Sequence, residues 1–205
     1  GVNSVTAASS ANLTLTAAQA AITKIGSDTT GNLTNAGTVT VSDTLANVDA
    51  GAATTLKSTN KVDTVIANAT SGANISATNV ADVDSIVLTA GQTYTLSTAQ
   101  ALIAKVGSGT VKDVSSATVT VAASSGDDLT TLVGVNSVTA ASSANLTLTA
   151  GQANVAVING GSAGALGSAG TVTVNAATGV NLATGSSALT ASGVDSIVLT
   201  ASQTY

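Results

Sequence analysis

The amino-acid sequence predicts an all-β protein with short helical turns, a parallel β-solenoid (β-helix) of about eight coils of roughly 25 residues each. Three observations lead to this fold class: long phrases recur without change, strand-like clusters follow one another at near-regular spacing, and polar and apolar residues alternate within the clusters. We expect residues 1–205 to form a single β-solenoid repeat domain, an internal slice of a longer repetitive protein.

The repeats are the strongest of the three observations. Residues 1–17 recur unchanged at 134–150, residues 83–90 recur at 194–201, and Thr-Val-Thr-Val occurs at 38–41, 118–121 and 171–174. Strand-like clusters are spaced by about 24 to 29 residues, within the range of periods that stacked repeats use. A coil of this length cannot cover its own apolar face, so each coil is expected to be covered by the next.

Alternation within the clusters predicts which side chains are buried. Thr alternates with Val or Leu, and a period of two places apolar side chains on one face of a strand and hydroxyls on the other. The expected inward set is Leu13, Leu15, Val39, Val41, Val119, Val121, Leu146, Leu148, Val172 and Val174. An antiparallel β-sandwich would also explain the alternation, but it would not explain the regular spacing or the unchanged phrases.

Short helices are predicted where a hydroxyl or carboxylate residue precedes an apolar run that ends near a glycine. This pattern occurs after Ser97-Thr98, after Ser42-Asp43 and after Asp127-Asp128. Helices of one or two turns are unstable alone, so these must pack against neighbouring coils.

The composition excludes most chemistry. The chain has no Cys, His, Met, Phe, Trp or Pro, its ten acidic residues are all Asp, its five basic residues are all Lys, and its net charge is −5. Without His and Cys there is no imidazole or thiolate metal ligand and no Ser–His or Cys–His nucleophile pair. Five scattered lysines cannot neutralise a phosphate backbone. We therefore expect no enzymatic activity, no cofactor, no nucleic-acid partner and, for want of a long apolar run, no transmembrane segment.

A recurring Val-Asx-Ser/Thr-Val/Ile phrase supplies the candidate sites. Its acidic or amide residues are Asn3, Asp63, Asp84, Asn136 and Asp195. A row of carboxylates would suit Ca²⁺, which takes six to eight oxygen ligands, whereas Asn in two of the five copies favours an Asx-turn hydrogen bond. Asp82 and Asp84, expected to point the same way from one strand, are the best calcium candidates. The pair Asp127-Asp128 is expected to cap a helix.

Further surface features allow other partners. Five Asn residues match the Asn-x-Ser/Thr acceptor pattern for glycans, a pattern that chance also produces in a chain so rich in Asn, Ser and Thr. They are Asn12, Asn32, Asn68, Asn74 and Asn145. The outward Thr rows resemble those of ice-binding proteins, although Thr is also favoured on the exposed side of ordinary strands.

The phrases at 13–25, 40–48 and 83–106 resemble the long repetitive extracellular proteins of bacteria, including surface-layer and adhesin-like proteins grouped with RTX calcium-binding exoproteins. This resemblance implies secretion and a place at the cell surface or in the extracellular matrix. The Gly-Asp nonapeptide that forms RTX calcium sites is missing, and the nearest stretches are 125–128 and 160–162.

Fold and resemblance together predict a structural cell-surface or extracellular-matrix protein. We expect a repeat rod of a bacterial surface layer, sheath or filament that assembles with itself, end to end or laterally, through open strand edges. The alternative is an adhesin stalk or binding module, stiffened by calcium or binding ice.

Overall fold

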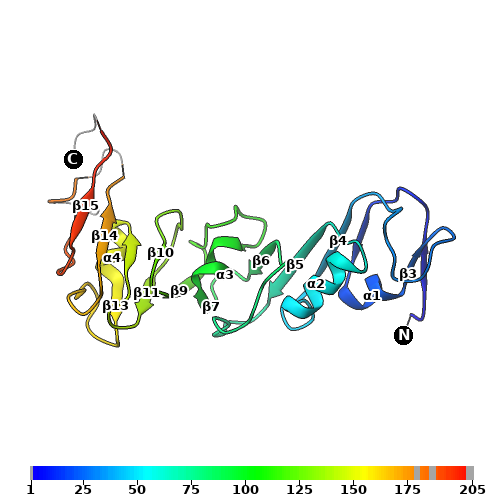
Figure 1. Ribbon diagram of the computed structural model, residues 1–205, viewed down its shortest axis with the longest axis horizontal. Helices are drawn as coiled ribbons and strands as arrows, with labels where there is room; N and C mark the ends of the chain where they lie inside the picture. The colour runs from blue at the N-terminus through cyan, green and yellow to red at the C-terminus, as the bar shows by residue number, and fades with distance from the viewer. Residues whose placement is uncertain (1, 178–180, 185–187, 202–205) are drawn as a thin grey trace. The chain divides into compact units, whose positions relative to one another are not determined.

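A computed structural model describes residues 2–177, 181–184 and 188–201. Its contacts divide the chain into two compact units. Figure 1 labels the helices and strands. Unit 1 comprises residues 1–72, 77–89 and 103–111, and unit 2 comprises residues 73–76, 90–102 and 112–205. Compact units do not by themselves set a domain boundary, so the single domain over 1–205 stays a prediction. The repeated Gln-Thr-Tyr at 203–205 lies outside the described residues.

Unit 1 contains a five-stranded sheet, a two-stranded sheet and two helices. The larger sheet runs, in spatial order, β2 (Leu13–Leu15), β4 (Val39–Thr44), β5 (Thr64–Ala69), β6 (Ser85–Leu88) and β8 (Ala104–Val106). The smaller sheet pairs β1 (Val5–Ala7) with β3 (Thr23–Ile25), and the helices are α1 (Ala17–Ile22) and α2 (Ala50–Ser58).

Unit 2 contains two four-stranded sheets. One runs β13 (Ala156–Ile158), β11 (Ser137–Ala140), β9 (Thr118–Ala123) and β7 (Thr93–Ser97); the other runs β10 (Asp127–Asp128), β12 (Leu146–Leu148), β14 (Val172–Asn175) and β15 (Ser196–Val198). Helix α4 (Ala150–Val155) belongs to this unit, as do all but the last residue of α3 (Thr98–Ile103).

The prediction of a single parallel β-solenoid is wrong. The described strands form four separate parallel sheets accompanied by helices, an α/β-like mixture in which about 13% of the residues are helical. The reason lies in how successive strands pair: β1 pairs with β3 across α1, whereas β2 pairs with β4 in another sheet. Strands that follow one another in the sequence, such as β1 and β2 or β9 and β10, can thus lie in different sheets, although β4, β5 and β6 share one. All strand pairs among the described residues are parallel, which also excludes the antiparallel β-sandwich there.

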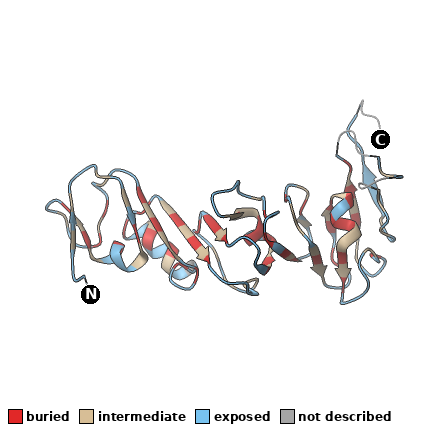
Figure 2. Ribbon diagram, turned by 180° about the vertical axis from the view of Figure 1, so that it is seen from behind, coloured by how far each residue is buried: buried red, intermediate tan, exposed pale blue. Residues whose placement is uncertain are grey.

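The predicted alternation of buried and solvent-facing side chains is confirmed. Of the ten residues predicted to face inward, all are buried except Leu13, which is half-buried, whereas the intervening threonines are half-buried or exposed. Figure 2 shows the resulting red bands along the strands. The core is made of Val, Leu, Ile and Ala, with Tyr94 of β7 as its largest fully buried side chain. Small side chains suffice because each sheet has only a narrow face to cover.

Helices α1 and α4 begin at capping boxes with identical geometry. In each box a Thr hydroxyl accepts from the backbone N–H of a Gln three residues on, and the Gln side chain accepts from the Thr N–H, which satisfies two otherwise unpaired donors. The pairs are Thr16 with Gln19 and Thr149 with Gln152.

Only one of the three predicted helices is placed correctly, and then only in part. α3 follows Ser97 as expected but gives way to β8 at Ala104. The stretch after Asp127-Asp128 is not helical, and these two residues form β10. After Ser42-Asp43 the chain stays in β4 and turns, and α2 begins only at the cap formed by Asp49. No described helix has the length and apolar character needed to cross a membrane.

Candidate functional site

The recurring Val-Asx-Ser/Thr phrase forms one repeated joint between neighbouring strands. In each joint the Asx side-chain oxygen accepts from a backbone N–H of the adjacent strand at 2.7 Å. The Asx N–H donates to the carbonyl oxygen of that same residue at 2.9 to 3.0 Å. We call this two-bond joint the Asx bracket. Its four members are Asp63 on Val39, Asp84 on Val65, Asn136 on Val119 and Asp195 on Val172.

The bracket corrects the predicted Asx-turn. The side chain does not accept from the residue two positions further along its own loop. It accepts from a residue 17 to 24 positions earlier in the sequence, on the neighbouring strand. Asn and Asp exchange freely at this position because the joint needs one acceptor oxygen, which both side chains supply. The Asx residue therefore marks where one strand is held against the one before it.

Asn3, the fifth member of the series, forms no bracket. It precedes β1, which pairs only with β3, and no described strand lies on the other side of β1. Its exposed side chain therefore has no neighbouring N–H to accept from. In the unchanged repeat at 134–150, Asn136 has β9 in that place and completes the joint.

A second joint involves the Asn-Leu-Thr phrase. Asn12 and Asn145 each accept at 2.8 Å from a backbone N–H 26 residues on, that of Thr38 and Thr171 respectively. The residue before each donor is a glycine, Gly37 or Gly170, and a Cβ there would overlap the Asn oxygen. It would also lie 2.8 or 2.7 Å from the carbonyl oxygen of Ser10 or Ser143. Close backbone approach, not turn geometry, requires glycine at these positions.

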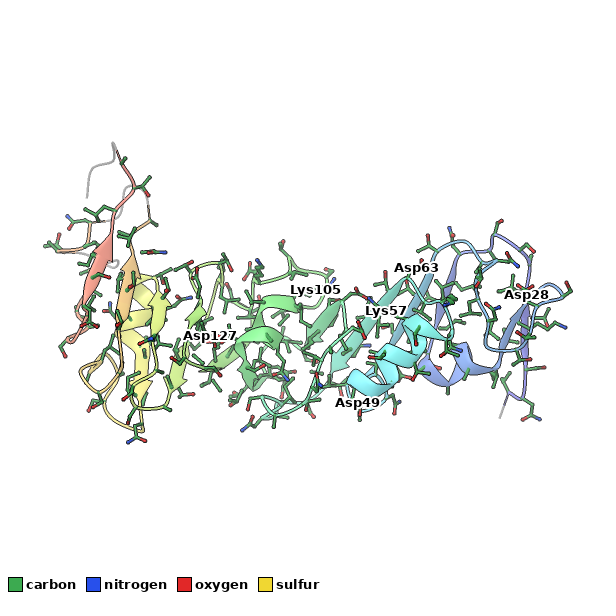
Figure 3. All side chains as sticks on the ribbon, in the orientation of Figure 1. Asp28, Asp49, Lys57, Asp63, Lys105 and Asp127 are labelled. Atoms are coloured by element: carbon green, nitrogen blue, oxygen red, sulfur yellow. The ribbon has the colours of Figure 1, made fainter. Side chains whose placement is uncertain are left out.

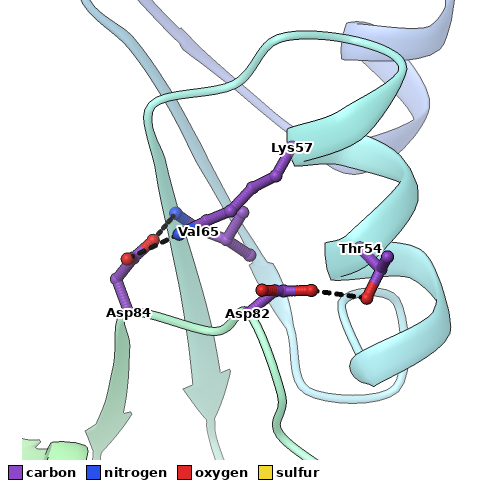
Figure 4. A network of polar contacts seen from close by, with 5 residues as sticks. All are labelled: Thr54, Lys57, Val65, Asp82 and Asp84. Carbon is purple, nitrogen blue, oxygen red and sulfur yellow. Dashed lines mark hydrogen bonds and ion pairs between the residues drawn. The ribbon is translucent and has the colours of Figure 1, made fainter.

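The calcium candidates Asp82 and Asp84 occupy different backbone environments. Neither lies in a strand: Asp82 sits in a turn with φ of 64° and Asp84 immediately precedes β6. Asp82 Oδ2 accepts from the Thr54 hydroxyl at 2.6 Å (Figure 4). Asp84 uses one oxygen for Val65 N–H and the other for Lys57 Nζ at 2.7 Å. Both carboxylates thus contact unit 1 groups instead of converging on one point.

The Asp residues do not gather elsewhere among the described residues. No group of three or more that could hold a metal ion occurs in this part of the chain. In unit 1, Figure 3 shows Asp28, Asp49 and Asp63 apart from one another, on separate loop segments. Two carboxylates already engaged by Thr54 and Lys57 fall short of the six to eight oxygens that Ca²⁺ takes. Calcium binding stays a prediction.

Four loops use an Asx side chain locally. The sequence predictions gave two of these Asx residues as glycan acceptors, one as part of a helix cap and one no role. In each, the Asx oxygen accepts from both the N–H and the hydroxyl of the Ser or Thr two residues on. The four are Asn32 with Thr34, Asn74 with Ser76, Asp113 with Ser115 and Asp128 with Thr130. The apolar residue between them points into the core in three cases: Leu33, Val114 and Leu129 are all buried.

The pair Asp127-Asp128 is therefore not a helix cap. Asp127 Oδ2 accepts from the Ser124 N–H at 2.7 Å and from the Thr98 hydroxyl at 2.6 Å, linking β10 to the start of α3 within unit 2. The spacing Asx-x-Ser/Thr around a buried residue was the available signal for these loops.

The predicted glycan acceptors differ in what their side chains do. Asn68 donates its Nδ2, the atom that would carry a glycan, to Ser42 Oγ at 2.9 Å and to the Asp43 carbonyl at 3.1 Å. Asn12 and Asn145 hold neighbouring strands, and Asn32 and Asn74 close local loops. Attached glycans stay a prediction.

Two carboxyl groups have shifted acidities. Burial pushes the pKa of Asp43 upward, but hydrogen bonds from the Asn47 side chain and from the N–H groups of Thr44 and Ala17 outweigh it and lower the pKa below 3.8. Hydrogen bonds from the Ser115 hydroxyl and N–H lower the pKa of Asp113. Both groups are held ionised by donors, as structural carboxylates are, and neither is poised to transfer protons near neutrality.

Unit 1 also has a polar hollow of about 450 Å³. Its lining is almost free of apolar side chains and includes Thr29, Thr30, Thr59, Asn60 and Lys61. Asn60 is buried and donates its Nδ2 to the Gly31 carbonyl at 2.6 Å, while Lys61 Nζ donates to the Ser58 carbonyl. The hollow offers hydroxyls and one ammonium group but no acid–base pair.

Comparisons with family models, with curated proteins and with solved structures found no match.

Proposed function

We propose that this chain is a structural protein of a bacterial cell surface or extracellular matrix, one that associates with copies of itself in a surface layer, sheath or filament. The observation that carries the proposal is the use of its recurring polar residues. Four Asx residues and two Asn residues at repeated positions bind the backbone of a neighbouring strand. Side chains committed in this way hold strands together and leave little for chemistry.

The absence of a catalytic grouping in the sequence supports the same proposal. With no His, Cys, Glu or Arg, a nucleophile could be activated only by Asp or Lys. The one ion pair among the described residues, Lys57 with Asp84, lies at the surface, where such pairs contribute about 1 kcal/mol or less. The extracellular location follows from the resemblance to repetitive surface proteins.

Sedimentation velocity and negative-stain electron microscopy of the purified 205-residue chain test this proposal. We expect the mean sedimentation coefficient to rise with concentration and elongated or sheet-like assemblies to be visible at high concentration. A chain that stays monomeric from micromolar to millimolar concentration would contradict self-association.

The second candidate function is that of a binding module, and the polar hollow of unit 1 favours it. Its hydroxyl and amide lining suits a neutral polyol or saccharide better than an apolar ligand. Nuclear magnetic resonance titration with neutral oligosaccharides tests it. Shifts confined to the backbone signals of 29–32 and 59–61 support binding there, and unchanged spectra at millimolar saccharide contradict it.

A further inference from the structure

Among the described strands, β15 exposes the most apolar side-chain surface. Ile197, Val198 and Leu199 are 47%, 52% and 54% exposed (the pale blue strand near the C label in Figure 2). β15 is the last strand of its sheet and pairs only with β14. An unpaired strand that also exposes large apolar side chains is a template for another strand.

An internal comparison shows what covers such a strand. The three strands β2, β4 and β5 of unit 1 match β12, β14 and β15 of unit 2 in sequence and register. Thr40 pairs with Thr64 as Thr173 pairs with Ser196. Thr64 and Ser196 each directly follow an Asp that forms an Asx bracket. In unit 1 a fourth strand, β6, follows, and Val65 is fully buried; its counterpart Ile197 is exposed.

The backbone of β15 is oriented to receive that fourth strand. The Val198 carbonyl accepts from Ala176 N–H, toward β14. Because alternate residues of a strand direct their backbone groups to opposite sides, the Ile197 N–H points to the free edge. In unit 1 the counterpart N–H, that of Val65, donates to Asp84 in an Asx bracket.

We propose that the segment Val2–Val5 of a second copy docks on β15 in parallel, with Asn3 forming an Asx bracket on Ile197. Two observations choose this occupant. Val2-Asn3-Ser4-Val5 has the same pattern as Val83-Asp84-Ser85-Ile86, which covers β5, and Asn3 is the one Asx of the series without a bracket. The free side of β1 is also the side on which its repeat, β11, carries a parallel strand.

The register follows from the pairing of β5 with β6. Ile66 pairs with Ser85 and Ala67 with Ile86, so Val198 of one copy pairs with Ser4 of the next, and Leu199 with Val5. The contact joins two different surfaces, head to tail, and each added copy offers the same free strand again. This inference rests on the proposed self-association and specifies its interface.

Two single substitutions test the joint without touching the strand pairs inside a copy. Ile197→Pro removes the N–H that faces the free edge, a place where a strand tolerates proline, and Asn3→Ala removes the acceptor. We expect each to abolish the concentration-dependent rise in sedimentation. Ile197→Val and Asn3→Asp keep the N–H and the acceptor oxygen, and these matched controls should assemble like the parent chain.

Disulfide formation tests the register directly, because the parent chain has no Cys. A mixture of Ser4→Cys and Val198→Cys chains should give a disulfide-linked heterodimer under mild oxidation. A mixture of Ser4→Cys and Ser196→Cys, two residues out of register, should give several-fold less. Rapid dimerisation of Val198→Cys chains alone would show that β15 pairs with itself, and would overturn the head-to-tail contact.

The failures of the two proposals are distinguishable. If Ile197→Pro and Asn3→Ala assemble like the parent chain, this interface is wrong while self-association stands. If the parent chain and both controls remain monomeric at all concentrations, the proposed function fails together with the interface.

Discussion

The unchanged repeats 1–17 and 134–150 have the same local structure but different burial. Ser10 and Ser143 have φ of 63° and 62°, and both caps, Thr16 and Thr149, have φ of −78° and ψ of 165°. Yet Leu13 is half-buried whereas Leu146 is 2% exposed, because β12 has strands on both sides and β2 has one on one side only. Local sequence sets the backbone, and the neighbouring strands set how much each apolar side chain contributes.

The largest expected effect is a difference in stability between the same substitution made in the two repeats. Leu146→Ala removes a fully enclosed side chain and should cost about 3 kcal/mol in the free energy of unfolding, whereas Leu13→Ala should cost about 1 kcal/mol. Urea denaturation followed by far-ultraviolet circular dichroism measures both. Equal losses would show that the two repeats have the same neighbours in solution.

Substitution of the glycines that pack against the two repeats should instead destabilise both equally. Gly37→Ala and Gly170→Ala each bring a Cβ onto an Asn oxygen and a Ser carbonyl, and we expect each to cost about 2 kcal/mol. Gly151→Ala is the control: it lies in α4 with no atom within 4 Å of the added Cβ, and should stabilise by about 0.5 kcal/mol. A neutral Gly170→Ala would mean that the Asn145 joint is not formed.

Removal of the Asx side chain should affect the stability of the two repeats differently, because only the second repeat forms an Asx bracket. Asn136→Ala leaves the Val119 N–H without its acceptor and should cost about 1 to 2 kcal/mol, while Asn3→Ala should leave the monomer's unfolding free energy unchanged. Asn136→Asp should recover most of the loss, since Asp serves in three of the four brackets. Thermal melting at low protein concentration compares these variants; equal destabilisation by Asn3→Ala would contradict its unpaired state in the monomer.

The smallest expected effect is the loss, at acidic pH, of the hydrogen bond that Asp43 accepts at the start of α1. Asp43 holds the first residue of α1 through the Ala17 N–H at 3.0 Å, and the counterpart of Asp43 in unit 2 is Ala176, so α4 has no such carboxylate. Because its pKa is lowered on folding, its contribution is present above the unfolded value of 3.8 and is lost as the pH falls through the folded pKa. We expect the Ala17 amide resonance to titrate below pH 3.8 while that of Ala150 does not. In Asp43→Asn the Ala17 titration should disappear.

Sequence reasoning located the strands and their buried faces because both depend on a period of two. Val39 and Val41 are buried, and they alternate with Thr38, which is exposed, and Thr40, which is half-buried, as the period of two requires. It failed on the sheets because pairing partners are not encoded in a single strand: β1 and β2 lie six residues apart yet belong to different ladders. It also predicted no helix at Ala17–Ile22, although Thr16 and Gln19 have the spacing of a capping box.

The candidate site was predicted by position but not by role. The Val-Asx-Ser/Thr phrase was identified as a recurring polar position, and an Asn–Asp exchange already argued against metal binding. That Asp63 should reach back to Val39 could not be predicted, because this bond depends on the strand alignment. Asp82 and Asp84 were expected to share a strand face, but the left-handed turn at Asp82 separates their surroundings.

Buried Tyr94 serves as an optical probe of unit 2. The chain has two tyrosines and no tryptophan; Tyr94, the one among the described residues, lies in unit 2, and the described segments of unit 1 contain none. Near-ultraviolet absorbance and tyrosine fluorescence therefore report on unit 2 alone, while unit 1 is silent at those wavelengths. A melt recorded by Tyr94 and one recorded by peptide absorbance will coincide only if the two units lose their structure together.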